Sequence, residues 1–432
     1  TGSELTGDAI DGGSGNDTLR LIASTTLGTA GASMSGLETL DMGKPISDSL
    51  AVDIPATARC IAWYAEAVDK VYDEVAPTAH DQLALITREP IGAVAAIVPW
   101  NFPLIMAAWK IGPALAAGNS FILKPSEKSP LSAIRLAALA AEAGIPDGVF
   151  NVLPGYGHTA GQALALHMDV DCIGFTGSTR TGKLMLQYSG QSNMKRVWLE
   201  CGGKSPNIIL ADCPDLDRAA ATAAGAIFFN QGEMCTAASR LIVEESVRDR
   251  VLEKVVAASR AMQPGDPLDP ATRMGAIVDE IQTRTVLGYI DSGRSAGAAV
   301  LTGGQRVLEQ TGGCYIEPTV FANVQSDMRI AREEIFGPVL AAITVKDADE
   351  AVRVGNGVEY GLAAAVWTRD IGKAHRIAKS LRAGMVYVNC YDADDITVPF
   401  GGFKQSGTGR DKSLHAFDKY TELKTTWIDL SQ

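Results

Sequence analysis

Residues 228–240 read FFNQGEMCTAASR and place one cysteine, Cys235, in a glycine-containing turn between an apolar helix and an apolar strand. A thiol in such a turn can face a cleft while the elements on either side hold it still. The attacking species in cysteine catalysis is the thiolate, which must be reachable. The segment therefore favours a nucleophilic role for Cys235. A buried structural thiol, the commoner role of a cysteine, is the alternative that these residues alone leave open.

The composition is that of a globular protein. The chain has 432 residues, of which 46% are hydrophobic and 20% charged, and this length predicts roughly two or three domains. The formal net charge of −12 and the lack of a Lys/Arg-rich run argue against nucleic acid or an anionic membrane as partner. No apolar run is long enough to predict a membrane span, and no signal peptide is visible.

The numbers and spacings of cysteine and histidine argue against disulfide bonds and metal sites. The seven cysteines are scattered, odd in number and without CxxC spacing, so neither a disulfide framework nor a zinc site is expected. A reducing compartment, the cytoplasm, fits best. The five histidines form no HxH or HExxH group, so we expect no catalytic metal.

From Met34 onward, strand-like and helix-like segments alternate. Apolar runs predict strands at 91–98, 119–124, 149–153, 171–176, 206–210, 240–244, 339–345 and 385–389. Helical spacing predicts helices at 50–68, 103–117, 130–143, 158–166, 179–189, 215–229, 246–262, 276–290, 347–355 and 371–382. This alternation predicts an α/β fold with parallel sheets covered on both faces. Two sheets fit the length better than one, with a boundary near 200–204, and residues 70–90 and 421–429 read as extended segments outside them.

Residues 1–33 differ from the rest, being rich in Gly, Ser, Thr and Asp and free of aromatic side chains. Residues 12–19, GGSGNDTL, match one calcium-binding nonapeptide of RTX proteins. A single repeat cannot bury a face, so a flexible leader is the stronger interpretation, with a calcium-linked fusion as the alternative.

Two strand ends carry phosphate- or ribose-binding patterns. FTGSTRTG (175–182) takes an apolar strand into a Gly-Ser turn that opens a helix, a setting that suits a phosphate; a purely geometric turn is the alternative. LKPSEKSP (123–130) places Lys124 and Glu127 at the end of another strand, where ribose hydroxyls can bind. Glu127 there would favour NAD over NADP. A solvated helix cap explains the same residues.

Two further segments suggest catalytic groups. In PWNFP (99–103), the amide of Asn101 is either a turn residue or a donor that stabilises an oxyanion. In VWLECGGK (197–204), Glu200 ends an apolar strand and is either exposed or held in an apolar cleft. Burial would raise its pKa and make it a general base near neutral pH.

Taken in order, the segments VPWNFPL, LKPSEKSP, FTGSTRTG, LECGGKSPN, FFNQGEMCTAASR, EEIFGPV and PFGGFKQSG resemble the NAD(P)-dependent aldehyde dehydrogenase superfamily over about residues 34–432. GRDKSLHA (409–416), TELKT (421–425), SNMKRVW (192–198) and DCPDL (212–216) are most similar to its γ-glutamyl-γ-aminobutyraldehyde dehydrogenase group. The resemblance implies oxidation of an aldehyde to an acid through a thiohemiacetal and a thioester on Cys235. Asn101 would hold the oxyanion, and Glu200 would activate water.

The resemblance also implies the binding residues. The cofactor positions that it matches are Trp100, Lys124, Glu127, Gly157, Gly161, Gly177, Ser178, Glu334 and Phe336. The substrate-tunnel positions are Met106, Trp109 and Asp392. Asp392, Asp394 and Asp395 at the tunnel mouth would favour a substrate with an ammonium group. A solvated acidic loop, or core packing for Met106 and Trp109, is the alternative.

The implied organisation is an NAD-binding domain from 34–69 and 91–202, a catalytic domain from 203–406, and segments 70–90 and 412–432 that join a homodimer or homotetramer. The family has strands and helices ahead of LETLDMGKP (37–45), and residues 1–33 stand in their place. A shortened cofactor domain would expose apolar surface. An inactive, scaffold-like derivative and a broad-specificity aldehyde dehydrogenase are therefore alternatives.

Overall fold

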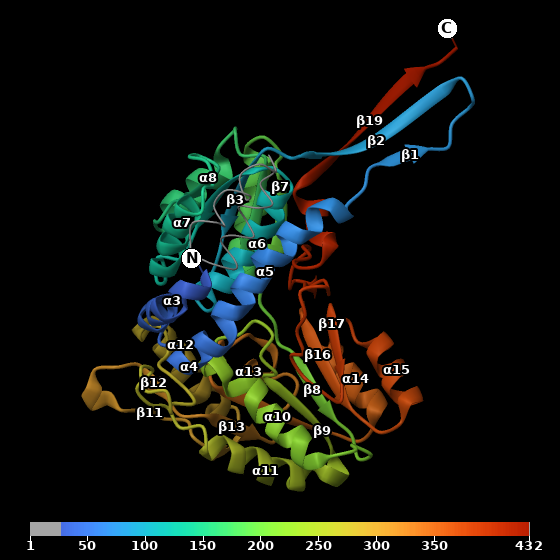
Figure 1. Ribbon diagram of the computed structural model, residues 1–432. Helices are drawn as coiled ribbons and strands as arrows, with labels where there is room; N and C mark the ends of the chain where they lie inside the picture. Colours follow the sequence, from blue (N-terminus) through green and yellow to red (C-terminus); the bar gives the residue numbers. More distant parts are fainter. Residues whose placement is uncertain (1–26, 432) are drawn as a thin grey trace.

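The structure is a computed structural model that describes residues 27–431. Two lobes, each built on one sheet, lie against each other, and a long arm formed by a three-stranded sheet extends away from them (Figure 1). Among the described residues, no helix is long and apolar enough to cross a membrane.

The first lobe contains a five-stranded sheet in which all neighbours are parallel. Its strands, in spatial order, are β5 (Phe150–Val152), β4 (Ser120–Lys124), β3 (Ala93–Ile97), β6 (Cys172–Thr176) and β7 (Arg196–Glu200). Its helices are α3 (Leu27–Met42), α5 (Ile54–Ala67), α6 (Pro103–Ala116), α7 (Leu131–Glu142), α8 (Gln162–Leu166) and α9 (Thr179–Gln191). Helix α6 packs on β3 and β4, and α5 packs on α6. The apolar strands are thereby covered, as their composition predicts.

The second lobe contains a seven-stranded sheet. Its strands, in spatial order, are β10 (Ala299–Thr302), β13 (Thr319–Ala322), β14 (Val339–Val345), β9 (Arg240–Glu244), β8 (Pro206–Ile209), β16 (Ala363–Trp367) and β17 (Met385–Val388). Its helices are α10 (Leu216–Phe228), α11 (Arg248–Arg260), α12 (Glu280–Ser295), α13 (Arg329–Arg332), α14 (Ala348–Asn356) and α15 (Ile371–Ser380). The parallel pattern breaks at one edge, where β10 runs antiparallel to β13. The predicted α/β fold with parallel sheets is confirmed, and the antiparallel edge strand β10 is joined to β13 without a crossover helix.

The arm is formed by segments from far apart in the sequence. Strand β2 (Gln82–Pro90) pairs antiparallel with β19 (Thr421–Asp429) over its whole length, and β1 (Glu74–Ala76) lies on the other side of β2. Trp427 is 62% exposed and Leu423 60% exposed. The arm therefore offers apolar side chains and strand edges outside both lobes (Figure 1).

Short elements complete the chain. The remaining strands are β11 (Arg306–Val307), β12 (Tyr315–Ile316), β15 (Tyr360–Gly361) and β18 (Phe403–Lys404). The remaining helical turns are Ile46–Asp48, Ser49–Asp53, Val68–Lys70, Gly157–Gly161, Phe229–Gly232, Glu245–Val247, Glu309–Thr311 and Leu414–Lys419. The RTX-like residues 12–19 lie outside the described part of the chain. Helix α3 begins at Leu27, so the end of the expected leader is helical.

Candidate active site

The turn that carries Cys235 connects α10 to β9 through an unusual backbone. Asn230, Gln231 and Gly232 have left-handed φ values of 48°, 57° and 72° in succession. Glycine is required at the third position, because a Cβ at Gly232 would collide with the carbonyl of Gly337. This sharp turn presents the half-buried Cys235 thiol at a fixed place.

Asn101 is held against the same turn. Its Nδ2 donates a 2.8 Å hydrogen bond to the Glu233 carbonyl, and Asn230 Nδ2 donates to the Asn101 carbonyl at 3.1 Å. The side chain of Asn101 is buried. One of its two amide N–H groups is thus used in fixing the turn, and the second has no acceptor among the described residues. The structure brings Asn101 and the nucleophile turn together.

Two cavities meet at Cys235. One has a volume of about 380 Å³ and the other about 200 Å³, and Cys235 and Met106 line both. The first is bordered by the carboxyl ends of strands in the five-stranded sheet. The second is bordered by α5, α6 and residues 387–412. The thiol can therefore meet two different ligands from two sides.

Most of the predicted cofactor residues line the larger cavity. These are Trp100, Lys124, Glu127, Gly157, Gly177, Ser178, Glu334 and Phe336. Lys124 Nζ lies 3.2 Å from Glu127 Oε2 at the end of β4, and Ser178 Oγ caps α9 by accepting from the Thr181 amide at 3.3 Å. Gly161 does not line this cavity; it is buried, and a Cβ there would contact Ile97.

The larger cavity fits a dinucleotide. The buried hydroxyl of Thr176, which lines it, has no hydrogen-bond partner in the described structure. The amino end of α9 begins beside it, and its free N–H groups suit a pyrophosphate. Gly157 has open space where a Cβ would lie. Among the described residues there is no group of three or more His, Cys, Asp or Glu side chains that could hold a metal ion.

Glu334 and Phe336 form the far wall of that cavity. Glu334 Oε1 accepts a 2.9 Å hydrogen bond from the Gly203 amide, and a Cβ at Gly202 would collide with the same carboxylate. Burial raises the pKa of Glu334 to about 7. Phe336 has a left-handed φ of 57° and meets Trp100 edge to face at 5.3 Å. The loop that contains Glu334 and Phe336 therefore packs tightly against the cavity wall.

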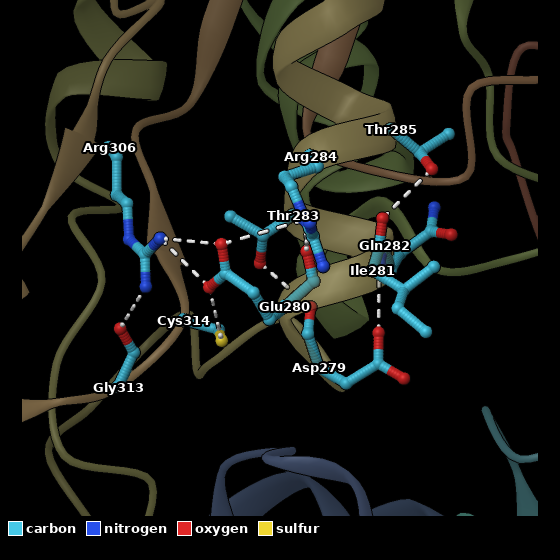
Figure 2. Close-up of polar contacts among 10 residues, drawn as sticks. All are labelled: Asp279, Glu280, Ile281, Gln282, Thr283, Arg284, Thr285, Arg306, Gly313 and Cys314. Carbon is cyan, nitrogen blue, oxygen red and sulfur yellow. Dashed lines mark hydrogen bonds and ion pairs between the residues drawn. The ribbon is translucent and has the colours of Figure 1, made fainter.

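One lining residue, Gln282, was not predicted. Its Nε2 donates to the carbonyls of Ile335 and Phe336 at 3.1 and 2.7 Å, which fixes the strained loop. Figure 2 shows Gln282 on the first turn of α12, where Asp279 caps the helix by accepting from the Gln282 amide at 2.8 Å. The Asp-Glu pattern predicts a helix start, but nothing in the sequence ties Gln282 to a loop more than fifty residues away.

Glu200 lies beside the site rather than in it. Its carboxyl group is buried, neither oxygen has a partner in the described structure, and it lines neither cavity. Burial, and then the charge of Asp411, raises the pKa of Glu200 well above its usual value. Burial, followed by the charges of Glu334 and Glu200, also raises the pKa of the Cys235 thiol. Burial therefore disfavours the charged form of both groups.

The three predicted substrate residues line the smaller cavity. Trp109 packs on Phe400 with ring centroids 4.8 Å apart, and Met106 lies one turn earlier on α6. Asp392 has a left-handed φ of 55° and accepts a 3.3 Å hydrogen bond from Thr236 Oγ1. Desolvation, and then the charge of Asp394, raises the pKa of Asp392 to about 6.

Comparison with known proteins gives consistent results. The sequence model of the aldehyde dehydrogenase family matches residues 21–426, so residues 21–33, which we had set apart as leader, lie within the match. NADP/NAD-dependent aldehyde dehydrogenase PuuC of Escherichia coli (strain K12) is 58% identical over 91% of this chain and 79% of the relative. The structure of indole-3-acetaldehyde dehydrogenase with NAD+ has a TM-score of 0.95 and 63% identity, covering 96% of this chain and 84% of that one. The γ-glutamyl-γ-aminobutyraldehyde dehydrogenase of Burkholderia cenocepacia J2315 has a TM-score of 0.94, with the same identity and coverage.

Proposed function

This chain belongs to the aldehyde dehydrogenase family, and on that premise we propose that it oxidises γ-glutamyl-γ-aminobutyraldehyde, or a related aminoaldehyde of polyamine breakdown, to the carboxylic acid. The acceptor is NAD, with NADP as a second possibility. One observation carries the proposal: a thiol in a strained turn lies where a cavity lined by the predicted cofactor residues meets a cavity lined by three aspartates. The names of the Escherichia coli and Burkholderia relatives support the same chemistry.

The proposed mechanism begins with Cys235. Its thiolate attacks the aldehyde carbon, and the free N–H of Asn101 together with the Cys235 amide stabilises the oxyanion. Because burial raises the pKa of this thiol, a base has to take its proton as the substrate binds. Cys235 carries the substrate as a thiohemiacetal before oxidation and as a thioester afterwards. Splitting the reaction in this way replaces one difficult step by two easier ones.

NAD, when bound, supplies the hydride acceptor for this chemistry. We assign the adenosine ribose to Lys124 and Glu127, the pyrophosphate to Gly177 and Ser178, and the nicotinamide ribose to Glu334 and Phe336. Trp100 and Gly157 border the same cavity. Glu127 is exposed and repels a 2′-phosphate, which favours NAD over NADP.

Release of the acid needs a base for water, and we assign it to Glu200. A buried carboxyl group with a raised pKa is suited to take a proton near neutral pH. Because Glu200 lines neither cavity, its side chain has to rotate toward the thioester to act. No hydrogen bond from the described residues holds its carboxylate back.

We further propose that the protein is a cytoplasmic homodimer or homotetramer. The arm made by β2 and β19 has little to pack against within one chain, and Leu423 and Trp427 are largely exposed on it. Exposed strand edges and apolar side chains of this kind pair with a second chain. All seven cysteines are free thiols, which favours a reducing compartment.

NADH formation from a set of aldehydes tests the proposal. The set contains γ-glutamyl-γ-aminobutyraldehyde, γ-aminobutyraldehyde, 3-aminopropanal and the uncharged propanal, each with NAD and with NADP. We expect the highest kcat/KM for the γ-glutamyl substrate with NAD. Equal values for propanal would indicate a broad-specificity enzyme. No turnover of any aldehyde by folded protein would indicate the inactive, scaffold-like alternative.

A further inference from the structure

The mouth of the smaller cavity carries charges of both signs, which an acidic loop alone does not explain. Asp392, Asp394, Asp395, Arg59 and Lys412 all line it. Two of these charged side chains are paired with each other, since Lys412 forms an ion pair with Asp394. The ammonium of Lys412 also lies 5.4 Å from the Trp109 ring centroid, so it is packed in place.

Asp392 also has a partner, and it lies next to the turn that carries the nucleophile. It accepts a hydrogen bond from Thr236, the residue directly after Cys235. An ammonium group that reaches Asp392 must therefore sit close to the reacting carbon. In an aldehyde such as 3-aminopropanal, the nitrogen lies about 4 Å from the carbonyl carbon, since three bonds of an extended chain span about 3.8 Å.

Arg59 and Asp395 are the two charged residues of this lining that are left to bind a ligand. Arg59 lies on α5, is exposed, and makes no ion pair or hydrogen bond with any described residue. Asp395 accepts hydrogen bonds from the Thr397 amide and hydroxyl at 2.9 and 2.6 Å, and no cation forms an ion pair with it within the described part of the chain. The Thr397 bonds lower the pKa of Asp395, and the charges of Lys412 and Arg59 act in the same direction. The guanidinium of Arg59 and the carboxylate of Asp395 therefore lie at the rim of the smaller cavity, and each can still bind a charged group of a ligand.

We propose that Arg59 and Asp395 form a subsite for the α-amino acid head of the substrate, in which Arg59 binds the carboxylate and Asp395 the ammonium group. A guanidinium binds a carboxylate through two parallel hydrogen bonds, which an ammonium cannot reproduce. The α-carbon of a γ-glutamyl substrate is eight bonds from its aldehyde carbon, about 10 Å when extended, beyond the reach of Asp392. The inference rests on the proposed function and adds the residues that select the head group.

Four aldehydes that differ only in their head group test this subsite. They are N-acyl derivatives of γ-aminobutyraldehyde: γ-glutamyl (both charges), glutaryl (carboxylate only), 4-aminobutanoyl (ammonium only) and butanoyl (no charge). For Arg59→Gln we expect kcat/KM to fall about tenfold or more, through KM, for the γ-glutamyl and glutaryl substrates alone. For Asp395→Asn the same loss should fall on the γ-glutamyl and 4-aminobutanoyl substrates.

Control variants separate the head-group effect from a general one. Arg59→Lys keeps the charge but not the bidentate geometry, and should recover only part of the loss. Arg250→Gln, on the exposed side of α11, should change none of the four values. An equal loss for all four substrates in Arg59→Gln, or no loss for the carboxylate-bearing pair, would overturn the subsite while leaving the proposed oxidation intact. If the wild-type protein oxidised none of them, both proposals would fail.

Discussion

The hydroxyl of Tyr391 donates a 2.6 Å hydrogen bond to the carbonyl of Thr236, the residue that follows Cys235. The next residue, Asp392, accepts from the Thr236 hydroxyl. One residue on the nucleophile turn is thereby held by two neighbours on the loop that forms the tunnel mouth. The geometry of the thiol and that of the substrate entrance are therefore coupled.

Removing the Tyr391 hydroxyl should loosen this coupling. In Tyr391→Phe, the Thr236 carbonyl loses its donor, and we expect the unfolding free energy to fall by about 1 kcal/mol. KM for aldehydes should rise several-fold, while the affinity for NADH should not change. Denaturant titration and steady-state kinetics measure the two effects. Tyr387→Phe is the matched control for stability, because its ring touches Tyr391 but its hydroxyl makes no hydrogen bond with a described residue. Equal stability of the two variants would contradict the role given to the bond.

Glu200→Gln separates the two halves of the reaction. A buried glutamine cannot take a proton from water, so the thioester should form and then persist. We expect a rapid burst of about one NADH per site, followed by a steady-state rate reduced about 10²–10⁴-fold. Stopped-flow absorbance resolves the phases. Glu253→Gln, exposed on α11, should behave as the wild type. A burst that disappears together with the steady-state rate would mean that Glu200 is needed earlier, for the thiol.

Much of the fold could be predicted because strand and helix signals agree along most of the chain. The eight apolar runs chosen as strands all contain strands, and the extended segments 70–90 and 421–429 form the arm. Strands β10 and β13 were not predicted, although each has four residues, as the predicted strands β8 and β17 do. Strand β16 escaped because three of its five residues are alanine, which does not favour strands. The arrangement of segments in space, such as β16 between β8 and β17, is set by tertiary packing.

The site was predictable where a motif fixes both backbone and side chain. Cys235, Asn101 and eight of the nine cofactor residues lie at one place for this reason. The exceptions depend on side-chain orientation. Glu200 ends β7 as expected, yet its carboxyl group is buried and lines neither cavity, and Gly161 does not line the larger cavity. Gln282 could not be predicted, because it binds a loop that is distant in sequence. Arg59 could not be predicted either, because the sequence pattern of α5 indicates which side chains are buried or exposed but not which of them reach the cavity.

Lys204 makes stability depend on pH. Its Nζ is buried and has no hydrogen-bond partner in the described structure, and burial lowers its pKa to about 7. Between that value and the unfolded pKa near 10.5, the unfolded chain binds one proton more, so the contribution of Lys204 to the unfolding free energy rises with pH. Lys204→Met should be more stable than the wild type by several kcal/mol below pH 7, with the difference narrowing toward pH 10.5.

Thermal unfolding of Lys204→Met across this pH range checks the sign. Lys379→Met, exposed near the end of α15, should show a small difference that does not vary with pH. A Lys204→Met protein that is less stable than the wild type at every pH would show that the ammonium is paired and stabilising.

The arm should hold copies of the chain together. Leu423 and Trp427 lie on one face of β19, and replacing both by Glu places charges on that face. We expect the wild-type protein to be a dimer or a tetramer and the double variant to be smaller, as measured by light scattering after size-exclusion chromatography. Thr426→Glu, on the opposite face, is the control. A monomeric wild-type protein, or a double variant of unchanged mass, would contradict this assignment.

Trapping the acyl group on the chain tests the thiol mechanism most directly. Glu200→Gln protein is mixed with γ-glutamyl-γ-aminobutyraldehyde and NAD, quenched in acid, and digested for peptide mass spectrometry. The acyl mass should be found on the peptide that contains Cys235, and the Cys235→Ala/Glu200→Gln double variant should show neither the adduct nor NADH. An adduct on another cysteine, such as Cys201 or Cys390, or NADH formation by Cys235→Ala protein, would contradict the role of Cys235 as the nucleophile.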